Sequence, residues 1–303
     1  MKNKYYFFLL ILLLAFGCDD TFSPHGEYEK RLVVFSVLDN RLDNQIIKLQ
    51  SSFEFQNSSL EEKRISNLTA TISDGVNVYQ CHDTTMFSDN YTYLVSSNFI
   101  LRRGMGYTIN IKGDDVPDIN SKAKVPESQY IFISYRDDQV QLSHSKPRGV
   151  KGFLIKYYVN FVIVENNQIL NEQSVEMPVD IIETEDGSKT ILYSSLNKNS
   201  NHVYRLGYIA TELAKYAPSN PDQKLLIKDC AVILFSLEDN VYNYLSTVNG
   251  FNDPVSVRLD IPNYANILNG HGIFGAITKD SVTQSIPNYI ISALGFGIFN
   301  SSN

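Results

Sequence analysis

The chain has 303 residues, of which 43% are hydrophobic and 19% charged, with a formal net charge of −7. This hydrophobic content describes a globular protein with a sizeable core and excludes a largely disordered chain. The charge is spread without a basic stripe, which argues against nucleic acid as a partner. Nineteen Tyr and seventeen Phe, with no Trp, favour strands over helices.

The first residues are typical of an export signal. Lys2 and Lys4 supply positive charge ahead of an apolar run over residues 5–16. This run is shorter than the roughly 20 apolar residues that a membrane-spanning helix needs. The pattern therefore predicts a lipoprotein-type signal peptide over residues 1–17.

The end of this signal predicts how it is processed. Ala15 and Gly17 are small, and Cys18 follows directly. The segment resembles a bacterial lipobox, with Ala15 where leucine is commoner. The resemblance implies that the mature chain begins at an acylated Cys18, and several acyl chains anchor stably because each buried methylene contributes about 0.8 kcal/mol. An ordinary cleaved signal peptide with a chance cysteine is the alternative.

Two acidic residues follow the cysteine. Asp19 and Asp20 resemble the export tag that sends many Bacteroidota lipoproteins to the cell surface. The resemblance implies an outer-membrane location with exposure at the surface, although a periplasmic orientation stays open. Residues 18–29 are predicted to form a tether between the anchor and the folded part.

The N-terminal half of the folded part alternates apolar and polar residues with the period of a strand. Asp74-Gly75 lies between two such runs and predicts a hairpin with a type I′ turn. The KVPES segment at 124–128 is predicted to lead out of the domain. Residues 30–126 are therefore predicted to form an immunoglobulin-like β-sandwich. The strand-like segments are RLVVFSVL, QIIKLQSSFEF, LTATISDGVNVY, YTYLVSS and GYTINIKG.

Residues 127–303 are predicted to form a second β-rich domain with one or two short helices. Turns are expected at Asn166-Asn167 and at Asp186-Gly187, because these residue types favour turns. One helix is predicted after Ser236, which resembles a capping box with Asp239 three residues later. Its apolar face would contain Leu237, Val241, Tyr244, Leu245 and Val248. The predicted strands are YIFISYRDD, the long run that starts FLIKYYVNFVIVE, VYRLGYIATEL and LLIKDCAVILFSL.

Cysteine and histidine residues do not predict a metal site. Apart from Cys18, the chain has only Cys81 and Cys230, for which two separate buried thiols are favoured over a disulfide. Cys81 and His82 are adjacent, so on a strand they point to opposite faces and do not ligate one metal together. The five histidines are scattered, without the i, i+4 spacing of a helical zinc site.

Residues 269–276 read NGHGIFGA, in which Gly270, Gly272 and Gly275 complete a G-x-G-x-x-G motif. A dinucleotide site needs a strand before the glycines, a helix after them, and an acidic residue about 20 positions later. A Pro/Asn-rich segment precedes this motif, the strand-like ITKDSV follows it, and no carboxylate side chain follows Asp280. We therefore predict structural glycines, each placed where positive φ or close packing excludes a Cβ.

Several short segments together resemble one known family. They are CDDTF, RLVVFSVL, the stretch from GYTINIKG to KVPES, and VYNYL followed by GHGIFGA. They resemble the Bacteroidota lipoproteins catalogued as domain of unknown function 4249, over nearly the whole mature chain. The resemblance implies a β-rich C-terminal domain that contains the glycine segment. It also implies an accessory lipoprotein whose gene often lies beside a TonB-dependent receptor, and it supplies no catalytic residues.

Two further groups of residues have a structural and a functional interpretation. Asp114, Asp115, Asp118 and Asn120 crowd one loop, which could hold calcium but matches no EF-hand spacing, so a solvated acidic turn is favoured. Aromatic platforms bind sugars, although core or interface packing is the commoner role of tyrosine. The candidate platform residues are Tyr91, Tyr93, Tyr157 and Tyr158.

These observations predict a non-enzymatic, lipid-anchored outer-membrane protein that works with a TonB-dependent transporter in nutrient uptake, without a cofactor. The expected partners are membrane lipid, through acylated Cys18, and the receptor, with no nucleotide or nucleic acid. The alternative is a stand-alone surface lipoprotein that binds glycan or peptide. There is no G-x-S-x-G nucleophile elbow, yet a catalytic triad assembled by the fold stays open.

Overall fold

The computed structural model describes residues 31–51, 65, 67–84, 92–96, 99–146, 148–183, 189–193, 196–247 and 264–299. All of them belong to one compact unit. Over these residues the protein is mainly β, as the sequence predicts, with three helices rather than one or two. None of the three is long and apolar enough to cross a membrane. Cys18, Asp19 and Asp20 lie outside the described residues.

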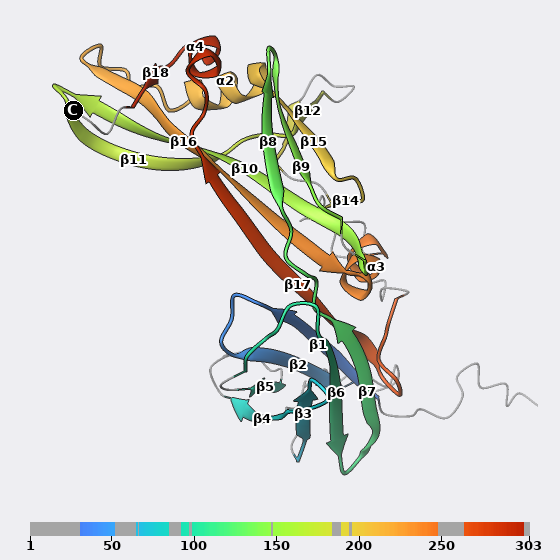
Figure 1. Ribbon diagram of the computed structural model, residues 1–303. Helices are drawn as coiled ribbons and strands as arrows, with labels where there is room; N and C mark the ends of the chain where they lie inside the picture. Colours follow the sequence, from blue (N-terminus) through green and yellow to red (C-terminus); the bar gives the residue numbers. More distant parts are fainter. Residues whose placement is uncertain are drawn as a thin grey trace, which may run out of the picture. The chain divides into compact units, whose positions relative to one another are not determined.

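Seven strands come from the N-terminal part and follow one hydrogen-bonded path, in the order β1-β2-β5-β4-β3-β6-β7 (Figure 1). Most alternate between buried and more exposed residues, because one face packs on a shared core. The strands are β1 (Leu32–Asp39), β2 (Gln45–Ser51), β3 (Thr69–Ser73), β4 (Val78–Thr84), β5 (Thr92–Ser96), β6 (Gly106–Gly113) and β7 (Val116–Lys124).

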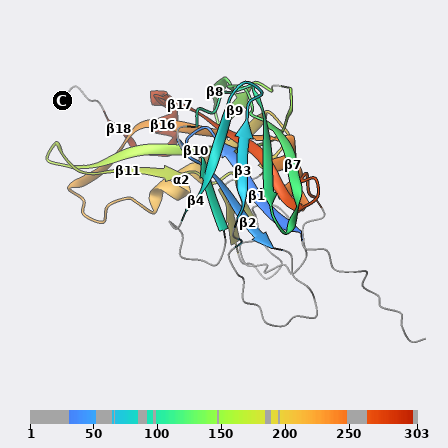
Figure 2. The same cartoon turned by 90° about the horizontal axis from the view of Figure 1, so that it is seen from below.

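This path curls back on itself. Asn120 in β7 forms a bridge with Leu268, just before the long strand β17 (His271–Gln284). Figures 1 and 2 both show β7 beside β17. The strands expected over residues 30–126 are therefore present, but in one curled path. Their arrangement as an immunoglobulin-like sandwich stays a prediction.

The same sheet continues into the C-terminal part. Its full path is β11-β10-β16-β17-β1-β2-β5-β4-β3-β6-β7, with β14 added to β10 and β18 to β16. The additional strands are β10 (Val150–Glu165), β11 (Gln168–Glu176), β14 (Leu196–Asn197), β16 (Gln223–Glu238) and β18 (Gly297–Ile298). The sheet thus crosses the predicted domain boundary at 126/127, and the division into two domains stays a prediction.

Smaller elements accompany this sheet. A three-stranded sheet has the order β15-β9-β8, and a separate hairpin joins β12 to β13. These elements are β8 (Ile131–Arg136), β9 (Gln139–His144), β12 (Asp180–Glu183), β13 (Lys189–Leu192), β15 (Asn201–Arg205), α2 (Leu206–Ala214), α3 (Asp239–Thr247) and α4 (Asn288–Leu294).

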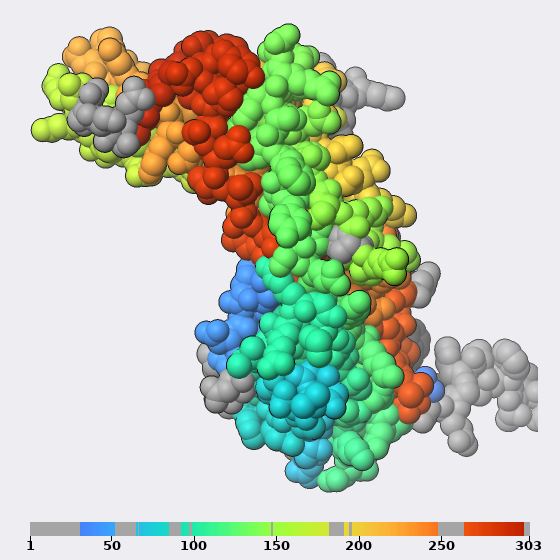
Figure 3. Space-filling view, in the orientation of Figure 1, coloured from blue at the N-terminus to red at the C-terminus, as the bar shows by residue number. Residues whose placement is uncertain are grey.

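Strand β17 connects the two parts of the protein. It pairs in parallel with β1 and antiparallel with β16, and Figure 3 shows the red surface of β17 against the blue surface of the first strands. Phe274 and Ala276 point into the N-terminal core. Ile273 and Ile277 belong to a second apolar cluster on the opposite face. Val282, further along, packs against the C-terminal core.

The glycines of NGHGIFGA lie where β17 approaches its neighbours. A Cβ at Gly270 would come within 2.8 Å of the carbonyl oxygen of Leu32. Gly272 has φ +94°, and a Cβ there would overlap the carbonyl oxygen of Val34. Gly275 faces α3 instead. The motif is therefore a feature of backbone packing, and the segment after it continues as a strand rather than as a nucleotide-binding helix.

Two of the three predicted turns lie among the described residues, and both form, although not in every detail. Asn166 and Asn167 both have positive φ, at 49° and 62°, and join β10 to β11. The Asp74-Gly75 hairpin also forms, but only Gly75 has positive φ. Its loop has four residues, and an Asp74 carboxylate oxygen accepts hydrogen bonds from the backbone N–H groups of Val76 and Asn77. Asp186-Gly187 lies outside the described residues.

Two predictions about helices need correction. The segment VYRLGYIATEL is a strand only as far as Arg205, because Leu206, Ile209 and Leu213 recur at helical spacing and bury one face of α2. Helix α3 begins at Asp239. The predicted cap Ser236 is a fully buried residue of β16, so the capping box is wrong.

Gly272→Ala is predicted to destabilise the fold by at least about 2 kcal/mol, because it combines positive φ with a backbone collision. Gly207→Ala is the matched control, since Gly207 lies in α2 with open space around it and alanine favours a helix. Urea unfolding should show a large loss for Gly272→Ala and no loss for Gly207→Ala. Equal midpoints would contradict the close approach of β17 to β1.

Candidate binding groove

Helix α3 packs on one face of the sheet at the ends of β10 and β16 (Figure 1). Two glycines allow this approach. A Cβ at Gly275 would overlap the Val241 side chain, and a Cβ at Gly152 would overlap the Tyr242 ring. Any larger residue at these two positions would push α3 away from the sheet.

An apolar groove of about 410 Å³ lies between α3 and the sheet. Its floor comes from β1, β10, β16 and β17, which are neighbours in the sheet, and one wall comes from α3. Volumes of about 300–1,000 Å³ with a mostly apolar lining are usual for small-molecule sites. The lining residues are Phe35, Val37, Arg41, Leu154, Lys156, Phe235, Leu237, Val241, Tyr244, Leu245, Ile273 and Ile277.

The floor is buried, whereas the rim is open to solvent. Ile273, Leu237 and Val241 are nearly inaccessible, while Phe35 stays 39% exposed. The ring of Phe35 meets that of Tyr244 edge to face, with 5.1 Å between centroids. This contact ties β1 to α3 and holds one edge of the groove.

Two of the described lining residues, Arg41 and Lys156, carry charge, and both are cationic. The Arg41 guanidinium lies 5.2 Å above the centre of the Phe235 ring. Its Nε donates hydrogen bonds to both carboxylate oxygens of Asp39, at 2.8 and 2.9 Å, and its Nη2 pairs with Oδ2. Lys156 donates to Glu176 at 3.0 Å. Both cations are therefore held in place beside the groove.

The turn that presents Arg41 is built around a buried glutamine. The Gln45 amide donates to the carbonyl oxygens of Asp39 and Leu42, and its oxygen accepts the backbone N–H of Asp39 at 2.9 Å. Gln45 is fully buried. The local sequence thus fixes the end of β1 and, with it, the direction of Arg41.

Glu238 supports the other side of the groove, at the start of α3. Its carboxylate accepts the backbone N–H of Asn240 at 3.0 Å and the Asn240 side-chain amide at 2.7 Å. Burial raises the pKa of Glu238 from 4.5 to about 7, against the opposing effect of backbone donors from Asn240, Val241 and Ala276. A group that gains or loses its proton near neutral pH therefore anchors the helix that forms the groove wall.

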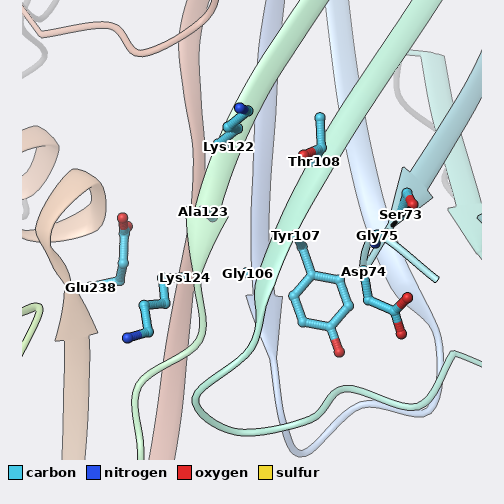
Figure 4. A pocket seen from close by; sticks show the side chains of 10 residues that line it. All are labelled: Ser73, Asp74, Gly75, Gly106, Tyr107, Thr108, Lys122, Ala123, Lys124 and Glu238. Carbon is cyan, nitrogen blue, oxygen red and sulfur yellow. Dashed lines mark hydrogen bonds between the residues drawn. The ribbon is translucent and has the colours of Figure 1, made fainter. Parts of the chain in front are cut away.

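A second hollow, of about 480 Å³, has a more polar lining. Figure 4 shows Asp74 toward one end, Glu238 at the other, and Lys122 and Lys124 on the strand between. The two ammonium groups point away from each other, so they do not converge on one ligand position. The groove has a buried, mostly apolar floor instead and is therefore the better candidate site.

The other residues singled out from sequence do not gather at the groove. Cys81 and Cys230 are separate buried thiols, as favoured. Asp118 forms an ion pair with Lys112 at 3.2 Å, at the β6–β7 hairpin. Among the described residues, no three His, Cys, Asp or Glu side chains are grouped as metal ligands would be.

Two of the three described tyrosines that were considered as a sugar platform are inaccessible. Tyr93 and Tyr157 are buried, and Tyr158 donates its hydroxyl to Glu176. Tyr91 lies outside the described residues. Alternation along β10 correctly places one of the adjacent pair inward.

Sequence reasoning identified part of the groove but not the site itself. Of the predicted helical face, Val241, Tyr244 and Leu245 of α3 line it. Leu237 also lines it but belongs to β16, and Val248 lies outside the described residues. Arg41, Lys156 and Glu238 were missed. The sequence gives little indication that these three residues belong to a site, because a charged residue beside an apolar strand usually lies on a solvent-exposed face.

The fold and groove together define a mainly β protein whose described residues form an apolar pocket suited to binding. A family model described as Domain of unknown function (DUF4249) matches residues 19–283. The chain therefore belongs to this family, as the sequence motifs predict. A search of curated proteins gave no match.

Glu238 is predicted to make stability fall as pH rises from about 4.5 to 7. Over this interval the folded protein binds the proton more tightly than the unfolded chain, so the unfolding free energy falls by up to about 1.4 kcal/mol per pH unit. Glu238→Gln should remove this contribution. Urea unfolding of the wild type and of Glu238→Gln at pH 5, 6 and 7 tests this prediction. An unfolding free energy that depends on pH identically in the two proteins would contradict it.

Proposed function

We propose that this protein is a lipid-anchored outer-membrane accessory protein, exposed at the cell surface, that works with a TonB-dependent transporter in nutrient uptake. Acylated Cys18 tethers it, and Asp19 and Asp20 direct its export. The folded part binds cargo or the receptor and performs no chemistry. The observation that carries the binding role is the apolar groove beside α3.

Several features of the groove support binding rather than catalysis. Ten of its twelve lining residues are apolar or tyrosine, and the other two are cations already paired with Asp39 and Glu176. Among the described residues, this lining contains no carboxylate, histidine, serine or cysteine to act as a base or nucleophile. It does offer the apolar surface and few polar groups that a ligand site needs.

The accessory role predicts a physical partner. The intact acylated protein, captured by an affinity tag from membranes solubilised in mild detergent, should bring down a large β-barrel receptor. Phe35→Asp is the matched variant, because it places a charge on the exposed rim without opening the core. This variant should reduce recovery of the receptor if the groove rim contacts the receptor. Recovery of the receptor should be unchanged if the groove instead holds cargo.

Two controls separate this proposal from the alternative. Palmitate labelling should disappear in Cys18→Ala, and protease treatment of intact cells should remove the wild-type protein from their surface. Persistent labelling, or complete protection from protease, would contradict anchoring at Cys18 or surface exposure. Recovery of bound polysaccharide or peptide without any receptor would favour a stand-alone binding lipoprotein.

A further inference from the structure

The groove has two chemically different ends, which the sheet register defines. Phe35 pairs with Ile273 at one end, close to Tyr244 of α3. At the other end Leu154 pairs with Phe235, which itself pairs with Lys279 of β17. Ile273 and Lys279 are six residues apart on one strand, so the groove floor is about 20 Å long.

Both cations belong to the second end. The Arg41 guanidinium lies over the Phe235 ring. Lys156 follows Leu154 by two residues on β10, so both point to the same face of the sheet. The described residues of the first end present apolar and tyrosine side chains to the groove. Positive charge is thus confined to one end of an otherwise apolar channel.

These cations keep hydrogen-bonding capacity for a ligand. Arg41 uses its Nε and Nη2 edge on Asp39, which leaves its Nη1 group. Lys156 bonds Glu176 with one of its three donors. Apart from the Tyr244 hydroxyl, the polar groups of the lining are therefore N–H donors. The polar part of a ligand that fits here must accept hydrogen bonds, and a carboxylate matches a held guanidinium best.

We propose that the groove binds an anionic amphiphile, namely a long unbranched carboxylate of the fatty-acid class. The hydrocarbon tail lies along Ile277, Ile273 and Leu237 toward Phe35, and the carboxylate meets Arg41 and Lys156. This assignment rests on the proposed binding function and names the class of cargo for the same site. Burial of the tail supplies most of the affinity, while the two cations orient the molecule.

Fluorescent fatty-acid displacement tests this directly, because the chain has no Trp to add background emission. The protein is the full mature chain, residues 18–303, with Cys18→Ser so that its own acyl groups cannot compete. cis-Parinaric acid serves as the probe, with palmitate and hexadecanol as competitors that share a tail length. Palmitate should displace the probe at least tenfold more effectively than hexadecanol.

Variants locate the binding. Lys156→Gln and Arg41→Gln should each weaken palmitate binding at least tenfold. Both variants should leave hexadecanol binding little changed. Lys112→Gln removes a cation from β6, away from the groove, and should have no effect. Leu245→Asp introduces a negative charge on the α3 wall and should abolish palmitate binding. Circular dichroism of each variant checks that the fold is kept. If Arg41→Gln fails to fold, Lys156→Gln alone tests whether a cation at this end of the groove binds the carboxylate.

The results separate this inference from the proposed function. Equal displacement by palmitate and hexadecanol, unchanged in Lys156→Gln, would overturn the anionic class. Absence of probe binding, or binding unaffected by Leu245→Asp, would overturn the groove as its site. If palmitate binds in the groove but the membrane capture recovers no receptor, the fatty-acid inference is supported and the accessory role is contradicted.

Discussion

The structure depends on how closely β17 can approach its neighbours. Along one strand, β17 must hydrogen-bond to β1 and β16 at its edges while α3 lies on its face. A side chain at Gly272 would collide with the backbone of β1, and one at Gly275 would collide with α3. Because β1 is hydrogen-bonded on both sides, it cannot move away without loss of pairing, whereas α3 would be displaced from the face of the sheet. The absence of a Cβ at Gly272 therefore permits the sheet to continue from β17 to β1, and its absence at Gly275 permits α3 to lie on β17.

The groove follows from the same constraint. Ile273 and Ile277 flank Gly275 on the face that α3 covers, and they supply the floor while the helix supplies the wall. Gly152 on β10 admits Tyr242 in the same way. Glu238 holds the first turn of the helix through Asn240. A short helix of nine residues would be marginal alone, so its position is set by these contacts rather than by its own propensity.

Much of the fold was accessible from sequence because its signals are local. Strand alternation, the Asn166-Asn167 turn and the helical period of α3 each involve residues close together in the chain. The glycine motif was correctly interpreted as structural from its Pro/Asn-rich approach and from the strand after it. The family assignment, which rests on motifs spread along the chain, is confirmed by the match over residues 19–283.

The rest required contacts between distant segments. The pairing of β17 with β1 joins residues that are far apart in the chain, such as Val33 and His271, and no local sequence pattern predicts it. The cap of α3 was misplaced because Ser236 and Asp239 have the right spacing, whereas β16 continues to Glu238 and buries the serine. The cations of the groove come from the turn after β1 and from strand β10, each with a carboxylate partner. Patterns within a single segment do not reveal that the two lie near one groove.

The central claim is that the missing side chain of Gly275 seats α3 on β17. Amide hydrogen exchange in Gly275→Val tests it most directly, because valine suits a strand and φ at this position is not positive. We predict at least tenfold faster exchange throughout α3, with little change in β3 and β6 of the N-terminal core. Unchanged protection of α3 in this variant would contradict the account.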